Sequence, residues 1–212
     1  MKQTLLMVLV FLGGCLACQR IYSQQYTVVG TDICNDGTRT THIGLSDSDP
    51  ARFYALYRDG EFLAVKRMNT KKTPNTLDFG SFSDAGKYTV VEFAKANPDF
   101  EKPESGKKIN GSVSINAVPV LSVSKKLEVS SGNPLKYMPQ ASAPGCTFKW
   151  TTRLDAGKAK GFRERGEGMI TDTIFVQGNQ PACVVYLITP FSPEQLGSCM
   201  GKSQELVVWI KP

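Results

Sequence analysis

Histidine is nearly absent from this chain, since His42 is the only one among its 212 residues. Imidazole serves as ligand in most metal sites and as base in nearly all Ser-His-Asp and Cys-His catalytic arrangements. The carboxylate residues also stand in no recognisable glycosidase or protease context. His42 itself lies in a segment where polar and apolar residues alternate. Ile43 and Leu45 occupy the apolar positions, so His42 is expected to face outward. We therefore predict no catalytic residues, no enzymatic activity and no cofactor.

Long apolar runs are missing beyond the N-terminus, where no stretch approaches the roughly 20 residues that a membrane span needs. No segment keeps an apolar period of 3.6 residues, so helices are not expected. The formal net charge of +6 is mild, and nothing resembles a nucleic-acid module with a basic stripe and stacking aromatics. The body of the chain is predicted to be all-β, to work in water and to bind no nucleic acid.

The N-terminus has the composition of a secretory signal peptide: Lys2 precedes the short apolar stretch 4–12, and small residues follow. We expect residues 1–17 to be removed. Leu12-Gly13-Gly14-Cys15 looks like a bacterial lipobox, which makes Cys15 the first lipidation candidate and Cys18 the second. Cleavage near Ser23 by the ordinary signal peptidase is the alternative. Either route exports the protein, and a lipid anchor would be its membrane contact.

Strand signals dominate residues 24–117, which we predict to form an antiparallel sandwich. Residues 108–117 alternate between polar and apolar side chains, as in a half-buried strand. Arg58-Asp59-Gly60-Glu61 lies between two apolar runs, and Asp-Gly supplies the positive φ angles of a tight hairpin turn. Asp84, Gly86 and Tyr88 fit a tyrosine corner, in which the tyrosine hydroxyl donates back to the main chain of the preceding turn.

Residues 118–212 repeat the same signals after Val118-Pro119 and predict a second sandwich. The segment from Cys146 to Trp150 alternates, so we expect Trp150 in the core. Further strands are expected at 170–176, 183–189 and 206–210. Residues 153–168 are rich in glycine and charge and poor in apolar side chains, which predicts an exposed loop or a ragged edge.

The order of these motifs resembles two known families. The first half is similar to the immunoglobulin-like repeat of large surface and adhesion proteins of the Bacteroidota, and the second half resembles a PKD-like domain. The resemblance implies non-catalytic spacer or adhesive units in secreted proteins. Its motifs are Tyr54-Ala55-Leu56-Tyr57-Arg58-Asp59-Gly60, Ala85-Gly86-Lys87-Tyr88-Thr89-Val90-Val91, Pro144-Gly145-Cys146-Thr147-Phe148-Lys149-Trp150 and Val207-Val208-Trp209-Ile210.

Four cysteines outside the leader allow three pairings, and export permits disulfides: Cys34, Cys146, Cys183 and Cys199. The loop before the third strand of a sandwich and the loop between its last two strands lie at the same end. We therefore favour a disulfide between Cys146 and Cys199 and a buried free thiol at Cys183. No Cys-x-x-Cys pair occurs among these four, which argues against zinc.

Two acidic clusters are candidate calcium sites, and one short motif is a candidate modification site. The clusters are Asp32, Asn35 and Asp36, and Asp47 with Asp49. They lack the spacing of a known calcium loop and fit turn capping better. Asp172-Thr173-Ile174 resembles the O-glycosylation motif of Bacteroidota secreted proteins, which makes Thr173 a glycosylation candidate.

The sequence thus indicates an exported, non-catalytic protein of the cell envelope or cell surface, serving adhesion, display or assembly. Its expected partners are other envelope proteins or surface glycans, and its oligomeric state is not indicated. The alternative is a glycan-binding accessory module of a surface uptake or degradation system. Exposed aromatic side chains at loop tips would favour that alternative, because sugar rings stack on them.

Overall fold

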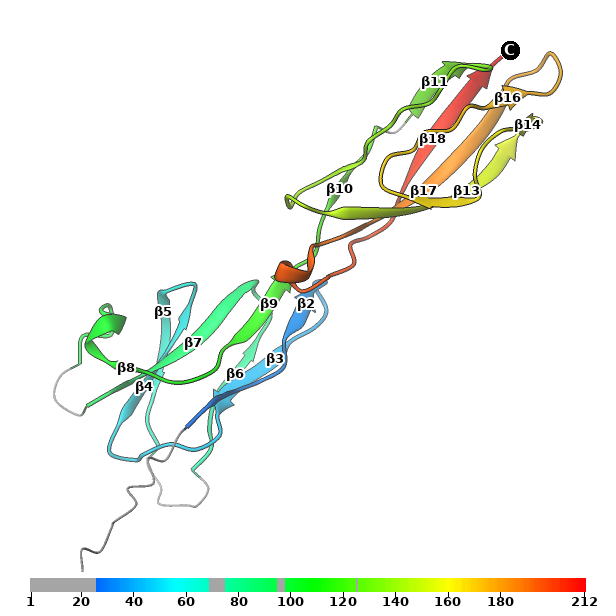
Figure 1. Cartoon of the computed structure of the whole chain (residues 1–212). Helices are drawn as coiled ribbons and strands as arrows, with labels where there is room; N and C mark the ends of the chain where they lie inside the picture. The colour runs from blue at the N-terminus through cyan, green and yellow to red at the C-terminus, as the bar shows by residue number, and fades with distance from the viewer. Residues whose placement is uncertain (1–25, 69–74, 95–97, 125) are drawn as a thin grey trace, which may run out of the picture.

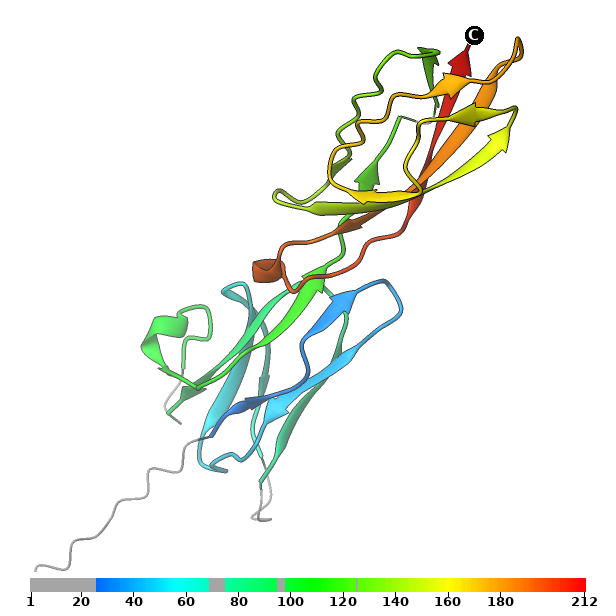
Figure 2. The ribbon, with the colours of Figure 1, turned by 45° about the vertical axis from the view of Figure 1, so that its right-hand side comes forward.

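The computed structural model describes residues 26–68, 75–94, 98–124 and 126–212, which are built almost wholly of β-strands. Two sandwiches stand end to end, the first coloured blue to green and the second green to red (Figures 1 and 2). The prediction of an all-β fold is confirmed. The predicted signal peptide and both lipidation candidates, Cys15 and Cys18, lie outside the described residues. Within the described part, no helix is long and apolar enough to cross a membrane.

The first sandwich consists of a small sheet facing a larger one. The small sheet has the order β1-β3-β6, from Val28–Val29, Thr41–Leu45 and Leu77–Phe82. The large sheet has the order β2-β9-β7-β4-β5, with β8 paired to β7, from Ile33–Asn35, Val113–Ala117, Gly86–Phe93, Phe53–Arg58, Glu61–Lys66 and Lys107–Lys108. β2 runs parallel to β9, and the other pairs are antiparallel.

The β4–β5 hairpin turns where the sequence predicts it. Asp59 and Gly60 have φ angles of 51° and 91°, the left-handed conformations of a two-residue hairpin turn. The strand predicted over 108–117 is interrupted instead. Gly111 has a φ of 87°, and only 113–117 continue as β9, although Ile109 is still buried. A local left-handed turn therefore splits a segment whose side-chain alternation is continuous.

A second apolar layer, which no pattern in the sequence predicts, covers the outer face of the large sheet. Tyr57 and Phe93 point outward yet are 1% and 3% exposed, because the segment after β7 folds back over them. Phe100 in this segment stacks on Phe62 with ring centroids 5.8 Å apart. The Tyr57 hydroxyl donates to the Phe100 carbonyl over 2.8 Å. The short 3₁₀ helix η1 (Pro103–Ser105) follows and leads into β8.

The second sandwich has one continuous sheet with the order β11-β18-β17-β13-β15. These strands are Lys126–Ser130, Gln204–Lys211, Ala182–Phe191, Thr147–Ala156 and Arg165–Glu167. Two short pairs, β10–β12 and β14–β16, accompany it, from Leu121–Ser122, Gln140–Ala141, Ala159–Lys160 and Phe175–Val176. As in the first sandwich, an early strand, β11, runs parallel to the last strand, β18.

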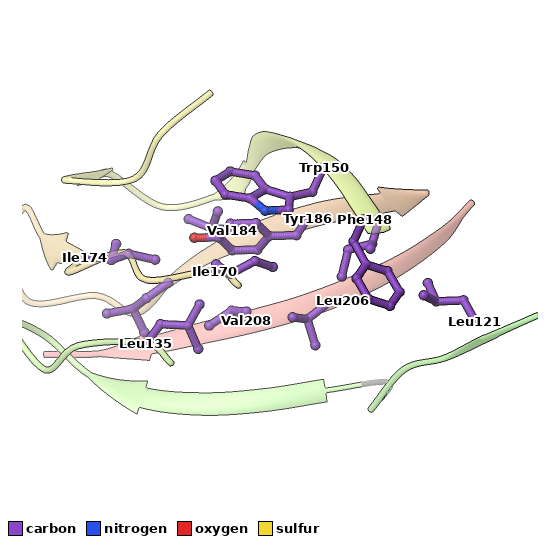
Figure 3. Packing of buried hydrophobic residues seen from close by; sticks show 12 residues of the cluster. Leu121, Leu135, Phe148, Trp150, Ile170, Ile174, Val184, Tyr186, Leu206 and Val208 are labelled. Atoms are coloured by element: carbon purple, nitrogen blue, oxygen red, sulfur yellow. The ribbon is translucent and has the colours of Figure 1, made fainter. Parts of the chain in front are cut away.

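The core of the second sandwich forms around Trp150, which is 2% exposed as predicted (Figure 3). Its indole packs edge-on against the ring of Tyr186, with centroids 5.6 Å apart. Gly166 on β15 leaves room for the indole, because a Cβ there would lie 2.2 Å from Trp150 Cζ2. Leu135, Ile170 and Ile174, which lie in irregular segments, complete this core.

One expectation for this half is met and one needs correction. Residues 153–168 form an exposed sheet edge, made of the end of β13, then β14 and β15, which is the second of the two predicted alternatives. Of the strand predicted at 170–176, only Phe175–Val176 remains, while Tyr137 and Ile170 form an isolated bridge. Side chains also alternate between buried and exposed in an extended segment that lacks regular strand pairing. The sequence pattern therefore does not distinguish such a segment from a β-strand.

Candidate functional site

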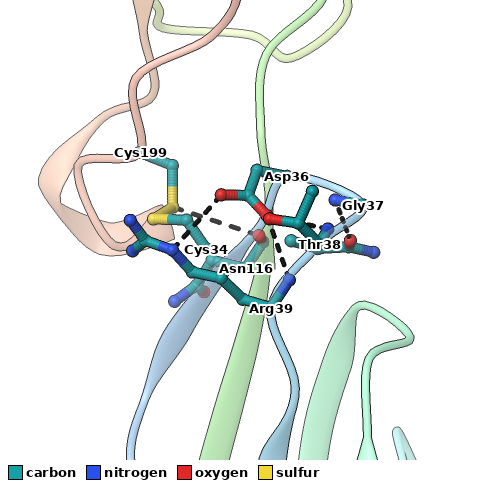
Figure 4. Close-up of polar contacts among 8 residues, drawn as sticks. Cys34, Asp36, Gly37, Thr38, Arg39, Asn116 and Cys199 are labelled. Atoms are coloured by element: carbon teal, nitrogen blue, oxygen red, sulfur yellow. Dashed lines mark hydrogen bonds and ion pairs between the residues drawn. A yellow bond between two sulfur atoms is a disulfide. The ribbon is translucent and has the colours of Figure 1, made fainter.

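The junction between the sandwiches is held by a disulfide that joins Cys34 on β2 to Cys199 in the loop between β17 and β18 (Figure 4). The predicted pairing of Cys146 with Cys199 is wrong, because Cys146 and Cys183 are free. That prediction placed the β17–β18 loop against its own sandwich. In the structure the loop reaches down to the first sandwich, where the Cα atoms of Cys34 and Cys199 lie 5.7 Å apart. The bond therefore links two domains across 165 residues of sequence.

Hydrogen bonds within the β17–β18 loop fix the position of Cys199. The Cys199 N–H donates to Ser192 Oγ over 2.8 Å, and the Ser192 N–H donates to the Cys199 carbonyl over 2.9 Å. Between them lies the 3₁₀ helix η2 (Glu194–Leu196), closed by Gly197 at a φ of 82°. Cys199 is 1% exposed, so the half of the disulfide that belongs to the second sandwich is shielded from solvent.

Glycines let this loop approach the first sandwich and the linker closely. A Cβ on Gly197 would lie 2.4 Å from the side-chain amide of Asn116 on β9. A Cβ on Gly201 would lie 2.0 Å from the carbonyl oxygen of Pro119 in the linker. The loop therefore packs on the end of β9 and on the linker, in addition to its covalent bond to β2.

The turn after Cys34 is organised by Asp36 (Figure 4). Its Oδ1 accepts hydrogen bonds from the Thr38 hydroxyl at 2.7 Å and from the main-chain N–H groups of Thr38 and Arg39 at 2.9 and 3.1 Å. The bonds from Thr38 are the main reason that the pKa of Asp36 lies below its ordinary value. The carboxylate thus acts as a turn cap, which fits the capping interpretation of this acidic cluster.

The other acidic residues of the two candidate calcium clusters also accept hydrogen bonds from the chain itself. Asp32 Oδ1 accepts from the Ser114 N–H at 2.7 Å, and Asp47 Oδ1 accepts from the Ser48 and Asn75 N–H groups. Among the described residues, no three His, Cys, Asp or Glu side chains are grouped as a metal site.

The remaining predicted residues take structural positions. The Tyr88 hydroxyl donates to the Asp84 carbonyl over 2.8 Å, the hydrogen bond expected of a tyrosine corner. Gly86 sits where a Cβ would lie 2.6 Å from Arg58 Cγ. Thr173 is half-buried, and its motif neighbours Asp172 and Ile174 are buried. The glycosylation motif is therefore part of the folded wall of the second sandwich.

The two free cysteines differ in environment, which predicts different reactivity. Cys183 is 1% exposed, and burial raises the pKa of its thiol, whereas Cys146 is partly exposed. Because the thiolate is the reactive form, iodoacetamide should label Cys146 of the native protein well before Cys183. Peptide mass mapping without reductant should find Cys34 and Cys199 unlabelled and linked to each other. Equal labelling of Cys34 and Cys146 would contradict the disulfide assignment.

Comparison with known proteins finds a family model that is similar to the second sandwich. Residues 127–212 match the model of the PKD-like domain family. No curated protein sequence matches the chain. Among solved structures, three titin immunoglobulin domains align over 87% of this chain and 63% of theirs, at 16% identity and a TM-score of 0.41. The insect immune protein hemolin aligns over 87% and 45%, at 13% identity and a TM-score of 0.35.

The immunoglobulin domains 1–4 of Sidekick-1 align over 88% of this chain and 49% of their own, at 11% identity and a TM-score of 0.38. The chain thus spans less than two thirds of each of these three structures. The family likeness of the chain is to PKD-like domains, over residues 127–212.

Proposed function

We propose that the protein is an exported, non-catalytic module of the bacterial cell envelope that presents a fixed two-domain surface to protein partners, in adhesion, display or assembly. The observation that carries this proposal is the Cys34–Cys199 disulfide across the junction. Disulfides form and persist in oxidising compartments outside the cytoplasm. In this proposal residues 24–117 and 118–212 are the two domains, and the leader is cleaved directly before the cysteine that carries a lipid anchor. Removal of residues 1–17 corresponds to an anchor on Cys18, and an anchor on Cys15 corresponds to cleavage after Gly14.

A fixed junction suits a binding or display module. Domains in one chain ordinarily move relative to each other unless their interface is large and apolar. Here the disulfide and the contacts at Gly197 and Gly201 replace such an interface. A surface whose parts are held in place before binding loses less conformational entropy when a partner binds.

The distribution of aromatic side chains favours protein partners over the alternative of glycans. Four tyrosines are completely or almost completely buried, namely Tyr54, Tyr57, Tyr88 and Tyr186. Trp209 is half-buried, and the Lys126 ammonium lies 5.8 Å from the centroid of its ring. Phe175 is the one aromatic residue among the exposed large apolar side chains of the described chain. A sugar-stacking platform needs several exposed rings in one plane.

The double variant Cys34→Ser/Cys199→Ser tests whether the disulfide fixes the junction. We expect each sandwich to keep its β spectrum, while small-angle X-ray scattering shows a broader range of shapes and proteolysis in 192–203 accelerates. Cross-linking in native envelopes should then recover fewer partner proteins than with the wild type. Cys146→Ser is the matched control, since Cys146 is free, and should behave as wild type. Unchanged shape, proteolysis and partner recovery in the double variant would overturn the proposal.

A further inference from the structure

The outer face of the small sheet of the first sandwich carries a serine, a histidine and an aspartate in one hydrogen-bonded row. His42 lies on β3, and Asp78 and Ser81 lie on β6. Ser81 Oγ is 3.0 Å from His42 Nε2, and His42 Nδ1 is 3.2 Å from Asp78 Oδ2. One ring nitrogen of the imidazole therefore contacts a hydroxyl, and the other contacts a carboxylate.

A β-bulge in β6 creates this row. In a regular strand, residues three positions apart point to opposite faces, so Asp78 and Ser81 would be separated by the sheet. Here Gly44 pairs with Asp78 and Ile43 pairs with Gly80, so Phe79 is an additional residue on β6. The bulge brings Asp78 and Ser81 to the same face while Phe79 stays 7% exposed in the core.

The hydrogen-bonding groups determine which nitrogen carries the proton. Asp78 Oδ1 accepts the Gly80 N–H over 2.8 Å, and this bond, with the bond to His42, holds the pKa of Asp78 below its ordinary value. The ionised carboxylate can only accept, so Nδ1 of His42 is the protonated nitrogen. In the neutral ring, Nε2 then presents its lone pair to the Ser81 hydroxyl. Ser81, His42 and Asp78 thus have the arrangement of the nucleophile, the general base and the group that orients the base in an activated serine.

We propose that Ser81 is an activated acyl-acceptor site, which takes the acyl group of an activated carboxylic ester. An open pocket of about 520 Å³ is lined by His42 and Asp78, together with Gly30, Gly44 and Thr31, and Ser81 adjoins it through its contact with His42. β6 is the edge strand of its sheet, so Ser81 lies at the free edge of that sheet.

The acyl transfer requires only the ester and the side chains of Ser81, His42 and Asp78. Ser81 Oγ forms a bond to the ester carbonyl carbon, while the Oγ proton passes to His42 Nε2. The bond from the carbonyl carbon to the leaving oxygen then breaks, and the leaving oxygen takes the proton from Nε2. The products are acyl-Ser81 and an alcohol. Because the side chains of His42 and Asp78 are 71% and 62% exposed, water is not excluded, and the site is one of covalent modification without efficient turnover.

p-Nitrophenyl acetate is the probe, applied to the full chain under native conditions, with peptide mass spectrometry to locate the acetyl group. We expect an ester-linked acetyl on Ser81, removable by hydroxylamine. His42→Gln should slow this acetylation about 10²-fold, the lower end of the usual contribution of a general base. Ser46→Ala is the matched control. Ser46 lines the same pocket, but its hydroxyl accepts from the Thr27 N–H at 3.1 Å and bonds no imidazole.

Circular dichroism and the melting temperature of each variant establish that the first sandwich is folded. An acetylation rate at Ser81 that is the same in wild type and in folded His42→Gln would overturn the proposal. So would the absence of acetyl-Ser81 in the wild type, or its appearance only after unfolding in urea. The proposal is independent of the binding function proposed above, since neither measurement involves a partner protein.

Discussion

Replacing Tyr88 by alanine should lower the free energy of unfolding of the first sandwich by about 3–5 kcal/mol, because the change leaves an aromatic-sized cavity. Tyr88 is completely buried, and its ring lies 5.3 Å from that of Phe82. Tyr88→Phe keeps the ring and removes only the hydroxyl that donates to the Asp84 carbonyl. It should cost on the order of 1 kcal/mol, rising to about 3 if the carbonyl is left without a partner.

The two tryptophans provide a way to measure this effect in the full chain. Both Trp150 and Trp209 belong to the second sandwich, so tryptophan fluorescence in urea reports on that domain. Hydrogen exchange of the β4 and β7 amides reports on the first. For Tyr88→Ala, we expect exchange to accelerate strongly while the fluorescence midpoint stays close to that of the wild type. Identical exchange in wild type, Phe and Ala variants would contradict the tyrosine corner.

The features that sequence patterns predicted here are local ones. Asp59-Gly60 determines a hairpin turn because few residues adopt its φ angles, and Tyr88 with Asp84 forms a contact only four residues apart. Alternation predicted the buried side of the segment around Trp150 for the same reason, since it reflects a period of two along one strand. Each of these inferences needs only neighbouring residues.

The features that were missed depend on distant segments. The Cys34–Cys199 disulfide requires that a loop of one domain reach the other, which no pattern within either domain encodes. Phe100 covers the outer face of the large sheet because of where its segment folds after β7. His42 was correctly predicted to face outward, yet its approach to Asp78 and Ser81 depends on an extra residue in the partner strand. Sequence spacing alone would have placed those two side chains on opposite faces.

In the second sandwich, the largest effect of a polar substitution is expected at Asp172. Its carboxylate is buried among the core side chains. Oδ2 accepts the Tyr186 hydroxyl at 2.7 Å, and Oδ1 accepts from Arg163 Nε at 2.7 Å. The Arg163 guanidinium in turn lies 4.8 Å from the centroid of the Trp150 ring. One carboxylate therefore connects the core tyrosine to the arginine that covers the core tryptophan.

Asp172→Ala should destabilise the second sandwich by about 2–4 kcal/mol. Most of this cost arises at Tyr186, whose hydroxyl is completely buried and would lose its acceptor. Arg163 contributes less, because its side chain is 49% exposed and its charge can return to water. Asp172→Asn keeps an acceptor of the same size and should cost clearly less than Asp172→Ala.

The matched control is Asp155→Ala, which removes a carboxylate that is 54% exposed and paired with Arg153 on the same strand. Exposed pairs of this kind contribute little, so the change should stay within about ±0.5 kcal/mol. Tryptophan fluorescence during urea unfolding measures all three variants, because Trp150 lies beside the network. Equal midpoints for Asp172→Ala and Asp155→Ala would mean that the buried carboxylate contributes no more to the second sandwich than a solvent-exposed one.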